Sequence, residues 1–424
     1  MPQQKNLNNW TFHPARNDLI AEAHARPALQ IPGPAEIIHI AFRCKQEIAY
    51  QFFDALVKGD KGDDPMPRHL TGTIRGVRVK LERHTEFMSC SLFQDLGAEE
   101  KPGSLDEILQ DVFPINQVEI FTLIRLRIVK TARDMVRRLP IEDRAYGGNL
   151  RHGIEVRSTF KPDEAGFINF IVLGKSMTSD ELGRRIQRLI EMETYRTMAL
   201  LGLPKARSVS GKLTEIETEL DMLTKQLRDS TDTSDLRDED FFRKLSDLSE
   251  RANLLVTETR YRFAASRAYF ALFQQRVASL QEEKVGDVQT MSGFLRSRLE
   301  PAIATIESTG KRQQTLTEDL SRALSLLRTR IELSLNKGNQ AVLKSMDKRH
   351  DQQLKISQAV EGLSIIAITY YAVGLVSHLL KALAQQPWMP LSTTVLTAIS
   401  VPLVFAFVWY TLRRARKSWV ERKQ

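Results

Sequence analysis

Hydrophobic and polar positions divide the chain into a first part that favours strands and a second part that favours helices. Several segments before residue 175 are short, apolar and rich in β-branched residues, and one helical segment follows the first of them. The strand candidates are EIIHIAFRC (36–44), GTIRGVRVKLERH (72–84), TEFMSCSLF (85–93), VEIFTLIRLRIV (118–129), IEVRSTF (154–160) and FINFIVLG (167–174), and the helix candidate is QEIAYQFFDALVKG (46–59). Residues 1–177 are therefore predicted to form a mixed α/β domain. We interpret Tyr146-Gly147-Gly148 as a turn.

From Thr178 onward the apolar residues recur at helical spacing. A Thr-Ser-Asp cap at 178–180 opens a helix that we expect Pro204 to close. A later series of apolar residues spaced three and four apart has the pattern of a coiled-coil seam, interrupted or kinked at Gly286, Pro301 and Gly310. The seam residues are Leu213, Ile216, Leu220, Leu223, Leu227, Phe241, Leu245, Leu248, Leu255, Tyr269, Phe273, Val277, Leu280, Leu316, Leu320, Ala323, Leu327 and Ile331. Residues 178–361 thus predict long antiparallel helices, the last of which leads into the next segment.

Two long apolar runs close the chain. Residues 362–380 carry no ionisable side chain except His378, and residues 392–412 carry none. Each run is long enough for a helix to cross a hydrocarbon core of about 30 Å. A buried hairpin in a soluble domain is the alternative, but two such runs in succession are hard to bury otherwise. The fold class is therefore α+β: an α/β domain, a long-helix coiled-coil stalk, and a two-helix transmembrane hairpin at 362–412.

Basic residues predict the orientation of the hairpin. They flank it on both outer sides and continue into the tail at 413–424, whereas the connecting loop contains only Lys381. By the positive-inside rule both long ends of the chain face the cytoplasm. The residues expected to anchor the hairpin at the membrane surfaces are Trp388, Trp409, Tyr410, Arg413, Arg414, Arg416, Lys417 and Trp419.

The charge balance agrees with this topology. The chain has 424 residues and a formal net charge of +9. After Thr411 there are six basic residues and one acidic residue, so the tail alone supplies +5 of that charge. The excess is a topology signal, and no nucleic-acid partner is expected. Cys44 and Cys90 form no CxxC pair, and a reducing compartment fits them.

The spans contain a stripe of small and hydroxyl-bearing residues at three- and four-residue spacing. Such residues allow close helix packing, within the hairpin or between subunits, and in a ring they are also able to line a pore. We keep both interpretations. No Asp or Glu lies within either span, which argues against a proton relay. The pore or helix-packing candidates are Ser364, Ala367, Tyr371, Gly374, His378, Thr394, Thr397 and Ser400.

The α/β domain offers little recognisable chemistry. His84 and Glu86 lie two apart on a predicted strand, so with His39 or Cys44 they could share a metal site. His24 and Arg26 are candidates for anion or metal binding, although a structural role in the loop explains them as well. The sequence has no P-loop, GxGxxG, HExxH or GxSxG pattern. We therefore predict no enzyme activity and no cofactor.

Long strings in the sequence resemble a bacterial family catalogued as domain of unknown function 3422 and described as membrane-anchored. The resemblance spans most of the chain and implies a protein of the inner membrane, without an activity or assigned catalytic residues. The matching strings are AEAHARPAL (21–29), ERHTEF (82–87), RLIEMETYRTMALLGLPKAR (188–207), LLRTRIELSLNKGNQAVLKSMDKR (326–349) and AVEGLSIIAITYYAVGLVSHLLKAL (359–383).

The overall layout also resembles that of CorA-type magnesium channels. Those channels carry a Gly-Met-Asn signature at the end of the first span, where this chain reads YYAVGLVSHLL (370–380). The layout implies a homo-oligomeric ion channel or transporter for a divalent cation, and the missing signature removes the basis for magnesium selectivity. The alternative is a membrane-tethered scaffold without transport activity. A two-span subunit cannot enclose a pore alone, so oligomeric state separates the two hypotheses.

Overall fold

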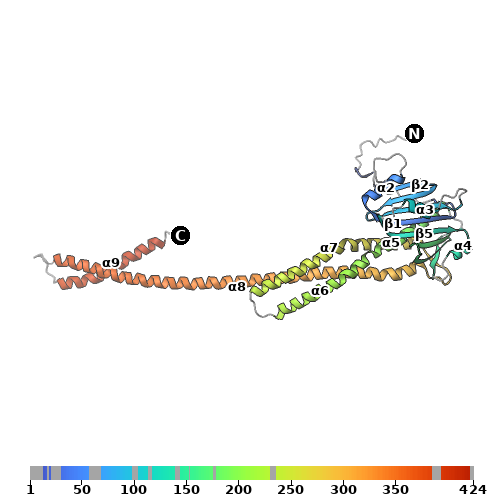
Figure 1. Cartoon of the computed structure of the whole chain (residues 1–424). Coiled ribbons are helices and arrows are strands. Elements are labelled where there is room, and N and C mark those ends of the chain that lie inside the picture. The colour runs from blue at the N-terminus through green and yellow to red at the C-terminus, as the bar shows by residue number, and fades with distance from the viewer. Residues whose placement is uncertain are drawn as a thin grey trace, which may run out of the picture. The chain divides into compact units, whose positions relative to one another are not determined.

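Figure 1 shows a computed structural model of the chain. It describes residues 13–16, 19–20, 30–56, 68–97, 104–112, 117–138, 144–151, 153–174, 178–229, 235–383 and 393–420. The chain forms two compact units, which are treated separately below. One consists of Met1–Thr231 and Asp240–Leu324, and the other of Asp232–Glu239 and Ser325–Gln424.

The first unit is built around a nine-stranded sheet with the order β2-β3-β4-β1-β5-β8-β7-β6-β9. Neighbouring strands are antiparallel except for β5 and β8, which are parallel. The strands are β1 (Ala35–Cys44), β2 (His69–Ile74), β3 (Val77–Arg83), β4 (Met88–Asp95), β5 (Val118–Val129), β6 (Tyr146–Leu150), β7 (Ile154–Pro162), β8 (Ile168–Gly174) and β9 (Glu283–Lys284). The predicted mixture of helices and strands in this part of the chain is confirmed.

Helices lie on both faces of the sheet. Alternate side chains of β1, Ile38, Ile40 and Phe42, point into a core with α2 (Gln46–Leu56) and α3 (Leu105–Val112). The intervening residue Ala41 faces the opposite way, where it packs with Met198 of α5 (Ser179–Leu200). Because side chains alternate along a strand, one strand serves two different layers. A short helix, α4 (Ala132–Arg137), follows β5.

Two strand predictions are corrected. The segment 72–84 is not one strand, because Arg75 and Gly76 turn the chain between β2 and β3 with φ angles of 50° and 81°. Two successive left-handed residues make the type of turn that best joins twisted antiparallel strands. Tyr146-Gly147-Gly148 is not a turn but part of β6, and a Cβ on Gly148 would lie 2.4 Å from the backbone oxygen of Glu283 in β9. Because Gly148 has no side chain, β6 and β9 are able to approach each other closely.

Long helices follow the sheet. They are α5, α6 (Gly202–Asp229), α7 (Asp235–Leu280), α8 (Met291–Leu383) and α9 (Thr393–Val420). The predicted cap is confirmed, since the Thr178 side chain accepts a hydrogen bond from the Glu181 amide. Within the first unit α7 runs antiparallel to α5 and α6. Arg185 of α5 donates a hydrogen bond to Ser279 O near the end of α7, whereas Glu219 of α6, later in the chain, accepts one from Arg251 earlier in α7. Leu213, Ile216 and Leu220 of the predicted seam are buried.

The expected helix breaks are only partly correct. Gly286 lies between α7 and α8 with a φ of 56°, but Pro301 and Gly310 lie inside α8 without ending it. Pro204 does not close α5 either. It occupies the first turn of α6, where the missing amide hydrogen is not needed by the helix.

The second unit contains the C-terminal part of α8 and all of α9. As the sequence predicts, α8 continues without interruption through residues 362–380. Among the described residues, two helices contain an 18-residue window apolar enough to cross a membrane, one in α8 and the other at Thr394–Thr411. Each of the two helices thus contains a segment with the length and apolar composition of a membrane span.

Candidate functional site

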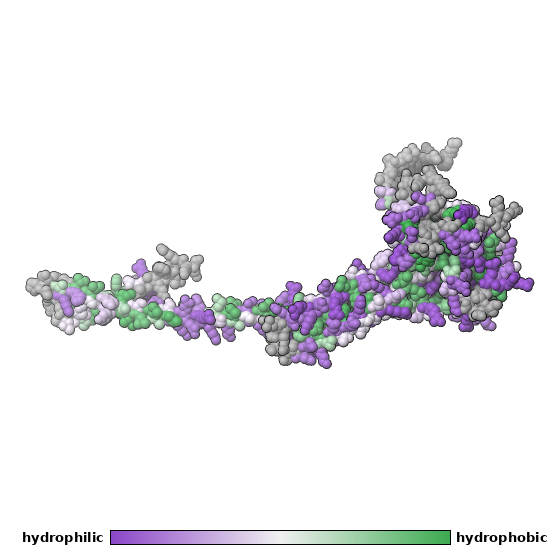
Figure 2. Space-filling model, viewed as in Figure 1, coloured by the Kyte–Doolittle hydropathy of each residue, from purple (hydrophilic) through white to green (hydrophobic). Residues whose placement is uncertain are grey.

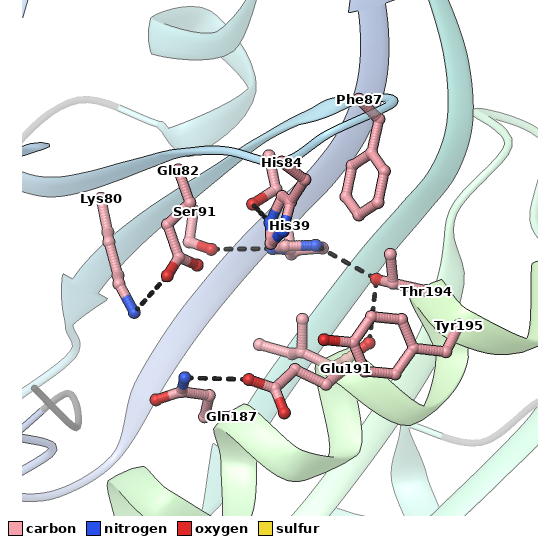
Figure 3. Close-up of a pocket in the computed structure, with 12 residues that line it drawn as sticks. His39, Lys80, Glu82, His84, Phe87, Ser91, Gln187, Glu191, Thr194 and Tyr195 are labelled. Carbon is pink, nitrogen blue, oxygen red and sulfur yellow. Dashed lines mark hydrogen bonds and ion pairs between the residues drawn. The ribbon is translucent and has the colours of Figure 1, made fainter. Parts of the chain in front are cut away.

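A small polar pocket lies between the sheet and α5 in the first unit (Figure 3). The sheet contributes the polar alternate positions of three adjacent strands, and α5 packs across them. The lining residues are His39 of β1, Lys80 and Glu82 of β3, Ser89 and Ser91 of β4, His84 and Phe87 of the β3–β4 connection, and Gln187, Ile190, Glu191, Thr194 and Tyr195 of α5.

His39 is the centre of a buried hydrogen-bond network. Its Nδ1 lies 2.8 Å from Ser91 Oγ, and its Nε2 lies 3.3 Å from Thr194 Oγ1. The Thr194 hydroxyl donates its hydrogen to Ile190 O at 3.0 Å, so His39 donates from Nε2 and accepts at Nδ1. Burial lowers the pKa of His39 to about 3, and His84 and Lys80 act in the same direction against Glu82. The imidazole is therefore neutral at physiological pH and joins β4 to α5.

An ion pair borders this network. Lys80 is only 3% exposed, and its Nζ lies 3.1 Å from Glu82 Oε1. Burial by itself would raise the pKa of Glu82, but the charge and hydrogen bond of Lys80 outweigh it, and the net pKa is lowered. On the helix side, Gln187 donates to Glu191 at 3.0 Å, and Glu191 also pairs with Arg276 of α7. Each charged group here thus has a partner of opposite sign or a hydrogen-bond donor.

The size of the pocket limits its chemistry. Its cavity of about 30 Å³ has room for one or two water molecules but not for a metabolite. A Ser–His pair is able to activate a nucleophile, but Ser91 is only 5% exposed and His39 only 4%. Within the described residues, no three His, Cys, Asp or Glu side chains are placed to hold a metal ion. The described contacts therefore form a polar junction between sheet and helix.

The predicted metal candidates are only partly brought together. His39 and His84 both line the pocket, and His84 stacks on Phe87 with ring centroids 4.3 Å apart. Glu86 instead forms an ion pair with Arg262 of α7 at 3.1 Å, and Cys44 lies beside Met88. His84 and Glu86 also lie in the connection after β3 rather than on a strand, because His84 N bonds Phe87 O across a tight turn. His24 and Arg26 lie outside the described residues.

The sequence analysis missed Lys80, Ser89, Ser91 and Thr194 as members of one site. A signal existed, since β3 and β4 both alternate polar and apolar residues in neighbouring strands. Such alternation is usual for an antiparallel sheet with one buried and one solvated face. Here α5 covers the polar face, and only the tertiary fold reveals that.

The pore or packing candidates fall on different surfaces of the two apolar helices. Ser364, Ala367, Tyr371, Gly374 and His378 of α8 are all exposed within the described chain. Within residues 362–380, the covered positions of α8 are instead Thr369, which is buried, and the half-buried Ile365, Ala372, Val373, Val376, Ser377 and Leu380. On α9, Ser400 is buried, Thr397 is half-buried and Thr394 is exposed. Thr397 and Ser400 thus lie on the covered face of α9, whereas the α8 stripe is uncovered.

The predicted anchors lie at the C-terminal end of α9 where the structure describes them. Trp409, Tyr410, Arg413 and Arg414 are exposed, and the Arg413 guanidinium lies 4.8 Å from the Trp409 ring centroid. The backbone of Arg416, Lys417 and Trp419 belongs to the same helix. Trp388 lies outside the described residues. An aromatic ring with a stacked cation suits a membrane–water boundary.

Comparison with known proteins gives a family without an assigned activity. No curated protein matches the chain. Among solved structures, a full-length CmaX protein is similar at 13% sequence identity, over 74% of this chain and 94% of that chain, with a TM-score of 0.17. A family model described as "Protein of unknown function (DUF3422)" matches residues 11–419. Because that match covers nearly the whole chain, the protein belongs to this family of unknown function.

Proposed function

We propose that this protein is anchored in the bacterial inner membrane by the α8–α9 hairpin and acts there as a homo-oligomer, with both long ends in the cytoplasm. The observation that carries the proposal is the set of large apolar side chains exposed on both helices. Leu363, Ile366, Tyr371 and Leu375 of α8 are at least 66% exposed, and so is Phe407 of α9. Figure 2 shows apolar surface on this part of the chain. Such surface requires lipid or protein contact.

The activity we propose is passage of an ion through a ring of hairpins. In this proposal the long helices transmit conformational changes of the α/β domain to the membrane hairpin. Support comes from α8, which contacts α6 through Arg312 and Glu217 and continues as one helix to Leu383. A continuous helix is one physical means of coupling distant parts of a chain. The exposed small and hydroxyl-bearing stripe on α8 also supports a role beyond packing on α9.

A membrane-tethered scaffold is the second candidate. The absence of Asp and Glu from residues 362–380 and 392–412 favours it, since the spans then offer a cation no charged ligand. In that case the hairpin is an anchor only, and the exposed surfaces bind partner proteins. Flux through reconstituted protein separates the two candidates.

Anchoring and orientation are tested by cysteine labelling. In a Cys44→Ser, Cys90→Ala background, single cysteines replace Gln386 in the loop and Lys423 in the tail. A membrane-impermeant maleimide added to spheroplasts is expected to label the Gln386→Cys chain and to leave Lys423→Cys unlabelled until the cells are opened. Labelling of the Lys423 position in closed spheroplasts, or release of the protein by alkaline carbonate, contradicts the proposed topology.

Transport is tested with purified protein in liposomes containing a magnesium- or cobalt-sensitive dye. We expect flux above that of empty liposomes, and Gly374→Leu to reduce it while the protein stays folded. Gly362→Leu is the matched control, because a Cβ at either glycine meets no atom within 4 Å in the described chain. Absence of flux from a folded, membrane-inserted oligomer overturns transport and leaves the scaffold.

A further inference from the structure

One segment of α8 has no partner in the described chain. Every side chain from residue 335 to residue 360 is exposed, although the segment contains seven large apolar residues. Those residues are Leu335, Val342, Leu343, Met346, Leu354, Ile356 and Val360. Most of them are more than half exposed, Leu343 to 63% and Ile356 to 65%. A helix of this length that buries nothing gains no packing energy, so a missing partner is the simplest physical reason for the pattern.

The apolar residues of this segment follow a seven-residue repeat. With Met346 at position a of the heptad abcdefg, Leu335, Val342 and Ile356 occupy d and Val360 occupies a. Leu343 flanks them at e, and Leu354 is the one large apolar residue on the outer face. A straight helix drifts by about 20° for each heptad, so a stripe that keeps this period favours a left-handed coiled coil.

The charges of the segment lie on the other side. Six of its seven Lys, Arg, Asp and Glu residues occupy b, c or f, and the positions e and g that border the stripe contain no Lys, Arg, Asp or Glu. The outer six are Lys337, Lys344, Asp347, Lys348, Asp351 and Lys355. Arg349, at d, is the exception. An interface along a and d therefore brings almost no like charges together between identical chains.

The same face remains free where α8 enters the apolar span. Val360, Ala367 and Gly374 continue position a, while the covered residues Ile365 and Thr369 lie at f and c. The covered face extends to Val373 and Ser377 farther along, which is the drift expected of a helix without supercoil. The hairpin thus covers the outer face of α8 and leaves the a face open on both sides of the membrane boundary.

We propose that residues 335–374 of α8 pair, parallel and in register, with the same residues of further copies of this chain. The inference rests on the proposed membrane anchoring, because hairpins in one membrane hold all copies parallel and at one depth. Asn339 and Gln353 then meet their own counterparts at position a. An amide both donates and accepts, so it is complementary to another copy of itself, and matched polar a positions fix the register of parallel coiled coils.

Disulfide cross-linking in native membranes tests the interface. In the Cys44→Ser, Cys90→Ala background, single cysteines replace Val342, Met346 or Ile356 on the stripe. The matched controls replace Lys344, Lys348 or Asp351 on the outer face of the same turns. All six side chains are exposed, so these changes leave the fold of one chain intact, which circular dichroism verifies. Paired Cβ atoms must approach to about 4 Å for a disulfide to form.

We expect oxidation to give several-fold more covalent dimer at the stripe positions than at the controls. Equal yields at both faces, or no dimer at the stripe, overturn the proposal. Protection of the stripe cysteines from maleimide without cross-linking also overturns it, because the occupant is then a different protein. Alkaline extraction of the same membranes separates the two proposals: chains that stay in the pellet without cross-linking refute only the pairing, whereas chains released into the supernatant refute the anchoring.

Discussion

His39 of β1 donates a hydrogen bond from Nε2 to Thr194 Oγ1 of α5, 3.3 Å away, and so links an inner strand of the sheet to the first long helix. The other ring nitrogen is occupied by Ser91 at 2.8 Å. A protonated ring at this place would lose the hydrogen bond that Nδ1 accepts and would be a buried charge beside Lys80. The junction therefore depends on a neutral histidine.

Stability is expected to fall in acid because of this residue. The folded-state pKa of His39 is lowered from 6.5 to about 3, so the unfolded chain binds one more proton in that interval. The free energy of unfolding then decreases as the pH falls from about 6.5 toward 3, by at most about 1.4 kcal/mol per pH unit from this group. Thermal unfolding in detergent across this range is the measurement. His39→Gln is expected to be less stable at pH 7 and to lose stability less steeply in acid, and parallel curves contradict the assignment.

Thr259 of α7 and Gln313 of α8 form a buried polar pair. Gln313 Nε2 lies 3.1 Å from Leu255 O and 3.0 Å from Thr259 Oγ1. We expect Thr259→Val and Gln313→Leu each to lower the free energy of unfolding by about 1–3 kcal/mol, because each leaves a buried polar group without its partner. The double variant is expected to cost less than the sum of the two. Additive losses in thermal unfolding exclude a coupled pair.

Gly202, at the start of α6, permits a close approach of α7 and α8. A Cβ at this position would lie 2.5 Å from Ser266 Oγ and 3.0 Å from Ile306 Cδ1. Gly202→Leu is expected to destabilise the protein by about 1–3 kcal/mol or more through overpacking. Gly211→Leu in the same helix is the control, since a Cβ there meets no atom within 4 Å. Melting temperatures that fall equally in both variants contradict the packing argument.

The two cysteines are expected to differ in reactivity. Cys90 is 3% exposed, and burial raises the pKa of its thiol to about 12. Cys44 is half-buried, and burial raises its pKa as well. Because the thiolate is the reactive form, maleimide at pH 7.5 is expected to label Cys44 slowly and Cys90 only after unfolding. Mass spectrometry of labelled peptides measures both, and rapid labelling of Cys90 in the folded protein contradicts its burial.

Arg349 is the one charged residue on the proposed stripe of α8. In a parallel, in-register assembly it meets its own counterpart, and a polar residue at such a position lowers coiled-coil stability. We expect Arg349→Leu to increase the resistance of the detergent-solubilised oligomer to dissociation on dilution. Lys348→Leu on the outer face is the matched control and is expected to have no effect. Light scattering after size-exclusion chromatography gives the masses, and an unchanged or weakened oligomer in Arg349→Leu argues against pairing along this face.

Much of the architecture was predictable from local patterns. The apolar run at 362–380 and the heptad positions before it depend only on residue spacing, and the structure has them in one helix. The segment 118–129 is β5 to the residue. The hairpin at Arg75-Gly76 and the strand at Tyr146 were missed because Arg-Gly and Tyr-Gly-Gly fit several backbone conformations, and strand pairing decides among them.

Local sequence patterns are sufficient to predict the order of the elements: strands first, long helices next, and two apolar helices of membrane length at the end. Periodicity and length are local properties. The surface that each strand or helix face contacts follows from tertiary packing. This packing placed β1 between β4 and β5, and it covered the polar side of β3 and β4 with α5 so that His39, Ser91 and Thr194 form one buried network. It also left the a/d stripe of residues 335–360 uncovered, since contact between residues far apart in sequence follows from packing and not from spacing.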